Sequence, residues 1–388
     1  MSEPKRTWAD IDLAALLSNY RALRARAGEG VKFLGVVKAN AYGHGAVPVA
    51  KLLEEAGADY LAVACLEEGA ALREAGVIMP ILILGLTEPR YTPELLRYDL
   101  TAAVGSRTCA EEMSRMASEA KKRVRIHLKI DTGMGRVGFT CREDRDPLSE
   151  ILPVMDLPGL DIEGIFTHFA TSDMPGIGDD YQKMQYRLFT GLTARLEEAV
   201  GRRFSIRHCA NSGAVTGHPD TFLDMVRPGI ALYGCYPSEL RESVGLTPVM
   251  SVRTRIAQIR DFREGDSVSY GRIYTAPGPR RIAVVPVGYA DGLHRVLSGK
   301  IDMLVHGQRV PQVGRICMDM CMLDVTGVPD AEEGDLVTLF GKDGEACIPV
   351  EEQAEKAGTI SYEILSGIAP RVERVYRMPQ NIKKILNN

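Results

Sequence analysis

Residues 31–39 read VKFLGVVKA, a short apolar run that finishes next to a lysine. Seven further runs of the same kind follow within the first 240 residues, at 60–66, 80–85, 100–105, 124–131, 160–169, 204–211 and 222–228. They are rich in Val, Ile, Leu and Ala, and most lack regular polar alternation. Strands that are buried on both faces of a parallel sheet have this composition.

Helical patterns separate most of these runs. Apolar residues recur at helical spacing in 46–56, 67–75, 110–121 and 181–200. Eight strand–helix repeats within about 200 residues predict a (β/α)8 barrel. A doubly wound parallel sheet is the alternative, and the count of eight strands argues against it.

The pattern changes from about residue 243 onward. Segments such as VMSVRTRIAQI, RRIAVVPVGYA and DLVTLFG are short, β-branched and separated by turn residues. We therefore predict an N-terminal (β/α)8 barrel over residues 1–240 and a mostly β domain over residues 241–388, with a late helix near 349–356. The N-terminal segment is also compatible with packing on the β domain.

Composition places the chain among ordinary globular proteins. Hydrophobic residues make up 45% of its 388 residues, and the net charge of −4 gives no reason to expect nucleic acid or an anionic membrane as a partner. The N-terminus has no secretory signal pattern, and the longest apolar run, near 77–86, is too short to span a bilayer. Eight scattered cysteines without a CxxC motif predict reduced thiols and a cytoplasmic location.

Catalytic groups of such barrels lie at the carboxyl ends of the strands, so the residues that end each run are the first candidates. Lys38 ends the first run, where an amine is costly to bury. A lysine in a dry pocket has a lowered pKa and can form a Schiff base. The alternative is that the strand stops one residue earlier and the lysine extends into solvent.

A glycine-rich loop, DTGMGRVG at 131–138, follows the fifth run. Gly133, Gly135 and Gly138 match the dinucleotide-binding pattern GxGxxG. The loop falls fifth in a series of eight strands, however, and no acidic residue ends a following second strand. We therefore predict a loop that directs Arg136 to the mouth of the barrel, with a solvated surface arginine as the alternative.

Polar residues at the last three strand ends suggest a phosphate site. The sixth run ends with His168, which alone is more typical of a structural residue than of a catalyst. Phosphate sites of barrels are often built after strands seven and eight, and helix starts favour anions. The residues at these two ends are Asn211, Ser212, Arg227, Gly229 and Ile230. A phosphate cradle together with a buried amine predicts pyridoxal phosphate as the cofactor.

Ten stretches then point to one family: WADIDLAALLSNY, VVKANAYGHG, KIDTGMGRVGF, THF, HCANSGA, DMVRPGIALYG, SVSYGRIY, VPVGYADG, VGRICMDM and TISYEIL. Over nearly its whole length, the chain resembles the alanine racemases, which are barrel-type pyridoxal-phosphate enzymes. The resemblance implies a homodimer that interconverts L- and D-alanine and supplies D-alanine for peptidoglycan.

The resemblance also implies which residues bind the cofactor and move protons. Lys38 would bind the cofactor covalently, and Lys38 and Tyr270 would exchange protons on opposite faces of the substrate. Arg227 would face the pyridine nitrogen, and His168 would hydrogen-bond near Arg227 and Tyr270. The remaining cofactor contacts would come from Tyr42, Asn211, Ser212, Gly229, Ile230 and Tyr362.

The substrate contacts implied by the resemblance lie in both halves of the chain. Arg136 and the backbone of Met318 would bind the substrate carboxylate. Lys129, which is often carbamylated in this family, would orient Arg136. Four further residues would support the site, two of them at the substrate access channel: Cys317, Asp319, Tyr289 and Arg295. Tyr270 and Asp319 would reach the site from the second subunit.

Several alternatives share parts of this pattern. An amino-acid decarboxylase of the same fold usually places an acidic residue where this chain has Arg227. A broad-specificity or serine racemase is a closer alternative. A non-catalytic pyridoxal-phosphate carrier resembles the barrel alone and would lack Tyr270. Cys317 and Cys321 are spaced as CxxxC, but no matching His or Cys pair accompanies them, so we expect no metal.

Overall fold

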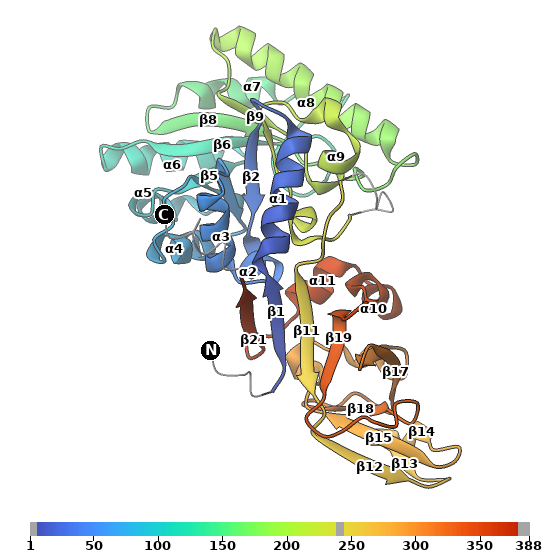
Figure 1. Ribbon diagram of the computed structural model, residues 1–388. Coiled ribbons are helices and arrows are strands. Elements are labelled where there is room, and N and C mark those ends of the chain that lie inside the picture. The colour runs from blue at the N-terminus through green and yellow to red at the C-terminus, as the bar shows by residue number, and fades with distance from the viewer. Residues whose placement is uncertain (1–5, 238–243, 379–388) are drawn as a thin grey trace. The chain divides into compact units, whose positions relative to one another are not determined.

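The structure is a computed structural model that describes residues 6–237 and 244–378. The chain divides into two compact units (Figure 1). Of the described residues, the barrel unit holds 15–41, 46–237 and 244–247, and the β unit holds 6–14, 42–45 and 248–378. The predicted division between residues 240 and 241 falls within 238–243, outside the described residues.

Eight parallel strands form the barrel, in the order β10-β2-β3-β4-β5-β6-β8-β9. The ring closes between β9 and β10, where the Asp224 and Arg227 N–H groups donate to the Arg207 and Ala210 carbonyls at 3.0 and 2.9 Å. The strands are β2 (Lys32–Val36), β3 (Tyr60–Val63), β4 (Ile81–Leu86), β5 (Thr101–Val104), β6 (Val124–Asp131), β8 (Leu160–Phe166), β9 (Ile206–His208) and β10 (Met225–Val226). Each predicted run overlaps one strand, and the predicted barrel is confirmed.

Several strands end earlier than predicted. Strand β2 ends at Val36 and β8 at Phe166, three residues before the ends of the predicted runs at 39 and 169. The residues just beyond are buried although they are not paired in the sheet: Val37 is 1% exposed and Phe169 is 2% exposed. Apolar composition reports burial rather than strand pairing, which explains the difference.

Helices follow most of the barrel strands (Figure 1). The four predicted helical segments correspond to α3 (Ala46–Glu55), α4 (Leu66–Glu74), α6 (Arg107–Glu119) and α8 (Asp179–Val200). The barrel unit also contains α5 (Thr92–Arg97), α7 (Leu148–Ile151) and α9 (Ser212–Gly217), and α1 spans Leu13–Ala27. The longest helix, α8, begins with Asp179 and Asp180, which favour a helix N-terminus, and ends at Gly201 in left-handed conformation.

The β unit is built on a ten-stranded sheet, and its path is β12-β15-β18-β17-β16-β19-β11-β1-β21, with β20 paired to β19. The N-terminal strand β1 (Trp8–Asp12) lies between β11 (Met250–Arg255) and β21 (Glu373–Arg377). The other strands of this sheet are β12 (Gln258–Phe262), β15 (Arg280–Val285), β16 (Asp302–Val305), β17 (Gln308–Val313), β18 (Cys321–Asp324), β19 (Leu336–Asp343) and β20 (Ala346–Ile348).

Smaller elements complete the β unit. A two-stranded ladder joins β13 (Ser267–Val268) to β14 (Tyr274–Thr275). Helix α10 (Val350–Ala357) lies within one residue of the predicted late helix, and α11 (Ser361–Ser366) follows it. The predicted mostly β domain is therefore confirmed.

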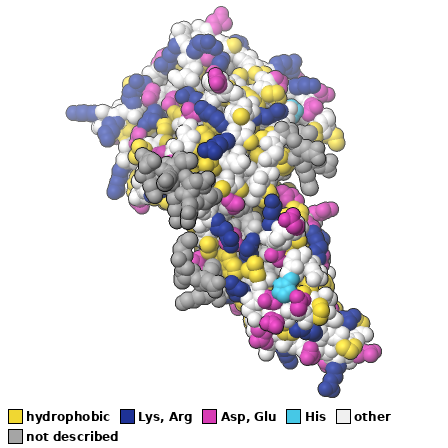
Figure 2. All heavy atoms as spheres, viewed as in Figure 1, with side chains coloured by type: hydrophobic (Ala, Val, Ile, Leu, Met, Phe, Trp, Pro, Cys, Tyr) yellow, Lys and Arg dark blue, Asp and Glu magenta, His cyan; other side chains and the backbone are white. Residues whose placement is uncertain are grey.

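Basic and acidic side chains are interspersed on the face shown in Figure 2, in keeping with the small net charge of −4. Among the helices of residues 6–237 and 244–378, none combines the length and the apolar composition needed to cross a bilayer. The cytoplasmic location stays a prediction.

Candidate active site

Lys38 begins α2 (Lys38–Tyr42), a short turn that follows β2 and has an unusual backbone. Four consecutive residues adopt left-handed conformations, with φ of 52, 53, 54 and 51° at Ala39, Asn40, Ala41 and Tyr42. A left-handed helical backbone costs a residue with a Cβ atom roughly 1–2 kcal/mol. The chain next to Lys38 is therefore held in a conformation that its own sequence disfavours.

Side-chain oxygens hold this turn in place. Glu68 lies on α4, and its two carboxylate oxygens accept the N–H groups of Ala39 and Ala64, each at 2.7 Å. The Asn40 amide oxygen accepts the Ala46 N–H at 2.8 Å, at the start of α3. The position of Lys38 thus depends on contacts with two helices that follow it in the sequence.

The surroundings of Lys38 favour its neutral amine. Burial lowers the pKa of Lys38, the Arg136 guanidinium lowers it further, and the Glu68 carboxylate opposes both effects. A lowered pKa increases the fraction of amine that is free to act as a nucleophile at neutral pH. Lys38 therefore has the electrostatic setting expected of a Schiff-base lysine.

Lys129 lies inside the barrel, near the carboxyl end of β6. Its side chain is 2% exposed, its Nζ atom donates to the Ile130 carbonyl at 3.0 Å, and it lies 5.1 Å from the centroid of the Phe166 ring. Burial lowers the pKa of Lys129 to about 7, with further lowering by Arg227 and an opposing effect of Asp131. The amine is therefore substantially neutral at physiological pH.

Asp131 shapes the glycine-rich loop that carries Arg136. Its Oδ1 atom accepts the N–H groups of Gly133 and Gly135, each at 3.0 Å. A Cβ atom on Gly138, whose φ is 124°, would lie 2.7 Å from the Lys129 carbonyl. Arg136 is exposed on this loop.

The glycine-rich loop does not lead into a helix. It continues into the two-residue strand β7 (Phe139–Thr140), which pairs with β6. A dinucleotide-binding loop of the GxGxxG type precedes a helix. This loop is therefore not of that type, as predicted.

Arg227 is buried directly after β10, with 3% of its surface exposed. Its Nη2 atom donates to the Thr167 and Cys209 carbonyls at 2.9 and 3.1 Å and lies 3.4 Å from His168 Nδ1. Its Nη1 atom lies 2.9 Å from His208 Nδ1. Burial lowers the pKa of Arg227 to about 10, which still leaves the guanidinium protonated near neutral pH.

The predicted phosphate residues come together at the ends of β9 and β10. Asn211 caps α9, because its amide oxygen accepts the Ala214 N–H at 3.1 Å. The Ser212 hydroxyl accepts the Gly229 N–H at 2.8 Å. Ile230 is fully buried at the start of a short 3-10 helix. The structure therefore places Ser212, Gly229 and Ile230 side by side.

Two predicted cofactor residues, Tyr42 and Tyr362, lie in the β unit. Their rings approach with centroids 5.9 Å apart, and Tyr362 belongs to α11. Tyr42 is 7% exposed, and burial raises the pKa of its phenol.

The loop at 317–319 is fixed from one side by Tyr289 and Ala290. Their N–H groups donate to the Cys317 and Met318 carbonyls, each at 3.0 Å. A Cβ atom on Gly288 would lie 2.4 Å from the Met318 carbonyl oxygen, so only glycine permits this approach. Met318 itself is 54% exposed.

Two further predicted residues, Asp319 and Arg295, also lie in the β unit. The Asp319 carboxylate accepts from Arg371 at 2.8 Å, and the Asp319 carbonyl accepts from Arg6 at 2.9 Å. Arg295 is exposed at the start of a 3-10 helix, Arg295–Leu297. Among the described residues, no group of three His, Cys, Asp or Glu side chains is arranged to hold a metal ion.

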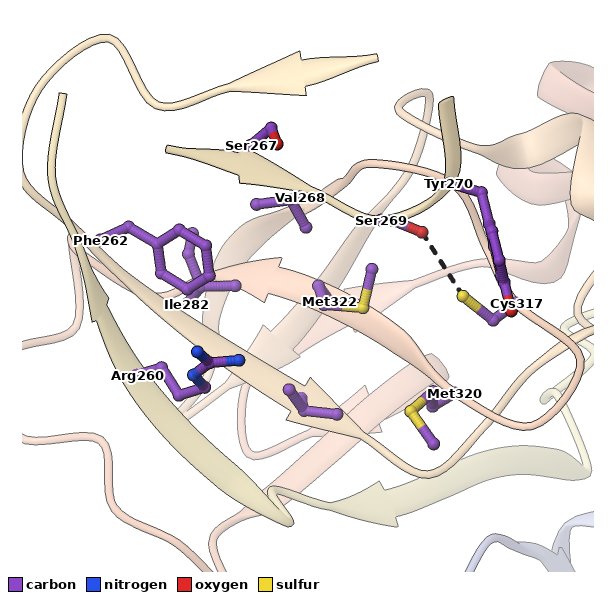
Figure 3. A pocket seen from close by; sticks show the side chains of 11 residues that line it. Arg260, Phe262, Ser267, Val268, Ser269, Tyr270, Ile282, Cys317, Met320 and Met322 are labelled. Carbon is purple, nitrogen blue, oxygen red and sulfur yellow. Dashed lines mark hydrogen bonds between the residues drawn. The ribbon is translucent and has the colours of Figure 1, made fainter. Parts of the chain in front are cut away.

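Tyr270 is 72% exposed and begins the 3-10 helix Tyr270–Arg272. It borders a cavity of about 380 Å³ in the β unit (Figure 3). Most of the lining is apolar: Phe262, Val268, Ile282, Val284, Met320 and Met322. Beside Tyr270, the Cys317 thiol lies 3.4 Å from the Ser269 hydroxyl, as the dashed line in Figure 3 marks.

Sequence reasoning missed a polar cluster in the barrel, formed by the buried His127, His208 and Tyr60 and by Glu163, whose side chain is 22% exposed. A signal was present: polar residues occupy every second position of RIHLKID at 125–131, and alternate residues of a strand share one face. The barrel interior along β6 is therefore polar, and the run at 124–131 is an exception to the mostly apolar composition of the eight runs.

The fold and these side chains define a class of protein: a (β/α)8 barrel with an additional β unit, a lysine of lowered pKa after the first barrel strand, and cationic groups at the ends of other strands. The family follows from comparison with known proteins. Residues 11–237 match the family described as "Alanine racemase, N-terminal domain", and residues 249–376 match "Alanine racemase, C-terminal domain". The chain belongs to the alanine racemase family.

Individual relatives agree with this assignment over their full length. The alanine racemase of Desulforamulus reducens is 46% identical over 378 residues, which are 97% of this chain and 100% of the relative. The structure of alanine racemase from Clostridium difficile 630 is 40% identical with a TM-score of 0.91, and 97% of each chain is covered. The Bacillus anthracis alanine racemase with bound L-Ala-P is 36% identical with a TM-score of 0.90, and covers 97% of this chain and 96% of its own.

Proposed function

We propose that this protein interconverts L- and D-alanine with pyridoxal phosphate bound covalently to Lys38, and that the D-alanine serves peptidoglycan synthesis. The observation that carries the proposal is Lys38 itself. It is a lysine placed directly after the first barrel strand, with a pKa lowered by burial, in a chain of the alanine racemase family. A neutral amine is the form that attacks an aldehyde.

The donors around Lys38 suit an anionic aromatic cofactor. Burial lowers the pKa of His168, and four basic side chains lower it further: Arg227, Lys129, Arg136 and Lys38. A phosphate and a ring oxygen would balance the positive charge of this group. The phosphate would be held by the Ser212 hydroxyl, by backbone N–H groups at Gly229 and Ile230, and by Tyr42, Asn211 and Tyr362.

When bound, the cofactor withdraws electrons from the amino acid and makes its Cα proton acidic. The protein has to remove that proton from one face and return one to the other, because return to the same face regenerates the same enantiomer. We assign one face to the Lys38 amine and the other to the Tyr270 phenol, with the roles exchanged between the two directions. Arg227 would donate a hydrogen bond to the ring nitrogen of the cofactor.

Arg136 and the Met318 N–H are proposed to bind the alanine carboxylate. We propose that a carbamate on Lys129 orients Arg136 for this role. The lowered pKa of Lys129 supports this, because a neutral amine can add CO₂. The carbamate would carry a negative charge and attract Arg136, whereas a protonated Lys129 would repel it. Supporting positions near the substrate channel are proposed for Cys317, Asp319, Tyr289 and Arg295.

We also propose a homodimer in which Tyr270 serves the site of the second copy. Tyr270 belongs to an apolar patch that consists of Tyr270, Ile273, Met318 and Met320, whose exposed fractions are 72%, 48%, 54% and 46%. Exposed groups of large apolar side chains are typical of subunit interfaces. A cavity next to Tyr270 offers further apolar area to a partner.

A racemase assay over alanine, serine and lysine tests the proposal. We expect alanine to react fastest in both directions, and Lys38→Ala to abolish turnover. Tyr270→Ala should reduce activity by roughly 10²–10⁴-fold, the usual contribution of a general acid or base, and should impair one direction of Cα proton exchange more than the other. Lys51→Ala, which changes an exposed lysine on α3, is the matched control. Faster turnover of serine or lysine would contradict the substrate assignment, and an active Lys38→Ala would contradict the role of Lys38.

A further inference from the structure

A continuous chain of hydrogen bonds leads from Arg227 through the interior of the barrel. Arg227 Nη1 lies 2.9 Å from His208 Nδ1, and His208 Nε2 lies 2.8 Å from His127 Nδ1. His127 Nε2 lies 3.1 Å from one Glu163 oxygen, and the Tyr60 hydroxyl donates to the other at 2.6 Å. The chain joins residues of five barrel strands or strand ends, and each member touches the next.

The chemistry of these groups permits only one direction of donation. A guanidinium has donors and no acceptor, so His208 Nδ1 has to accept from Arg227. His208 then carries its proton on Nε2 and donates to His127 Nδ1. His127 in turn carries its proton on Nε2 and donates to Glu163. An ionised carboxylate accepts from both His127 and Tyr60, which completes the chain.

Charge sits on Arg227 and Glu163 and not on the two histidines between them. His127 and His208 are fully buried, and burial lowers the pKa of both, so both rings are neutral. Burial alone would raise the pKa of Glu163, but hydrogen bonds from His127 and Tyr60 outweigh it, the nearby Arg125 guanidinium adds to them, and the net shift is downward. Glu163 is therefore ionised at neutral pH, as is Arg227.

The other groups that face Arg227 supply no negative charge in the unmodified chain, and a carbamate on Lys129 would pair with Arg136. Its remaining partners are the carbonyls of Thr167 and Cys209 and the neutral ring of His168. Burial raises the pKa of the Cys209 thiol to about 12, so this thiol stays neutral. Lys129 lies near enough for Arg227 to lower its pKa, and its unmodified amine supplies no negative charge.

Asp131 also does not act as the counter-ion of Arg227, because its carboxylate has other partners. Its carboxylate accepts from two glycine N–H groups and pairs with Arg142 at 3.2 Å. A fully buried cation without a compensating charge is costly, so Arg227 requires one from another direction.

We propose that Glu163 is the remote counter-ion of Arg227, and that His127 and His208 connect the two charges through a hydrogen-bond chain of fixed direction. Tyr60, Glu163, His127 and His208 are thus positioning residues, which keep Arg227 protonated and hold its guanidinium plane. Phe166 stacks on His208 with an interplanar angle of 5° and a centroid distance of 4.8 Å, and so fixes the ring that accepts from Arg227. Only the importance of Arg227 for catalysis rests on the proposed function.

Nitrogen NMR of the holoenzyme labelled with ¹⁵N-histidine tests the direction of the chain. We expect His127 and His208 to be neutral near pH 7, each with its proton on Nε2. A coupling between His208 Nε2 and His127 Nδ1 across their hydrogen bond identifies the pair without any substitution. A proton on Nδ1 of either ring, or double protonation of either, would overturn the proposal.

Glu163→Gln separates the charge from the hydrogen bonding. The glutamine carbonyl can still accept from His127, while its amide group donates to the Tyr60 hydroxyl, so both histidines keep their protons on Nε2. Loss of the negative charge should shift deprotonation of Arg227, followed by its ¹³Cζ signal, to lower pH. Glu198→Gln, which removes an exposed carboxylate from α8, is the matched control.

An unchanged Arg227 transition in Glu163→Gln, relative to the Glu198→Gln control, would refute the counter-ion role. The two proposals fail separately. A protein with the expected histidine protonation and no racemase activity would contradict the proposed function and leave the hydrogen-bond chain intact.

Discussion

The Lys129 amine is almost fully buried, so little water remains to stabilise its charged form. Burial lowers its pKa to about 7, with Arg227 as the next contribution. Protonated amine therefore dominates below about pH 6 and neutral amine above about pH 8. Since only the neutral amine adds CO₂, we expect carbamylation of Lys129 to increase over this pH interval.

Carbon NMR with ¹³C-bicarbonate measures that carbamate directly. The signal should grow with rising pH and disappear in Lys129→Arg. In Lys51→Arg, which changes an exposed lysine of α3, it should persist. A carbamate signal that survives in Lys129→Arg would place the modification elsewhere.

Individual residues were predictable from sequence to different degrees. Lys38 and Arg227 stood out because each is a charged residue next to an apolar run, and Arg136 stood out because it lies in a glycine-rich loop. His127 and His208 did not, because each histidine alone is typical of a structural residue. Their role depends on a contact between residues 81 positions apart, which no local sequence pattern predicts.

At the scale of elements, the left-handed turn after Lys38 predicts an unusual effect of glycine. Ala39 is exposed at φ 52°, where glycine has no Cβ penalty. Relief of roughly 1–2 kcal/mol should exceed the entropy cost of about 0.4–1 kcal/mol in the unfolded chain. We expect Ala39→Gly to stabilise the protein by about 0.5–1 kcal/mol.

Urea denaturation of the holoenzyme measures this change in the free energy of unfolding. Ala71→Gly, at an exposed position of the regular helix α4, should destabilise by about 0.5–1 kcal/mol and serves as the control of opposite sign. Equal losses in the two variants would mean that the turn at Ala39 is not strained in solution.

The sequence predicts the type of each element well and the residues at which it ends less well. The eight runs identified the eight barrel strands, because burial on both faces leaves a strong apolar signal. The predicted end of β2 is three residues too late, because KANAY contains no glycine that would indicate a left-handed backbone. That turn is held instead by Glu68, 29 residues beyond Ala39.

At the scale of the whole molecule, the proposed dimer predicts which exposed apolar residues are needed for assembly. Ile273→Glu introduces a charge into the apolar patch around Tyr270 and should produce monomers with reduced racemase activity. Ile78→Glu is the control: Ile78 is 84% exposed in the barrel unit and should tolerate the same change. Analytical ultracentrifugation and activity at increasing dilution follow the two effects. A fully active wild-type monomer would contradict the shared site.

The place of β1 in its sheet has a consequence for biosynthesis. Strand β1 is complete by Asp12, but its neighbours β11 and β21 begin at Met250 and Glu373. At about 5–20 residues per second, a ribosome needs roughly 20–70 s to reach the second neighbour after finishing the first strand. Until β11 is made, Trp8, Ala9 and Ile11, all buried in the finished protein, have no strand to pair with, and β1 lacks its second neighbour until β21 follows. The nascent chain therefore depends on protection of its first strand until the strands beside it are made.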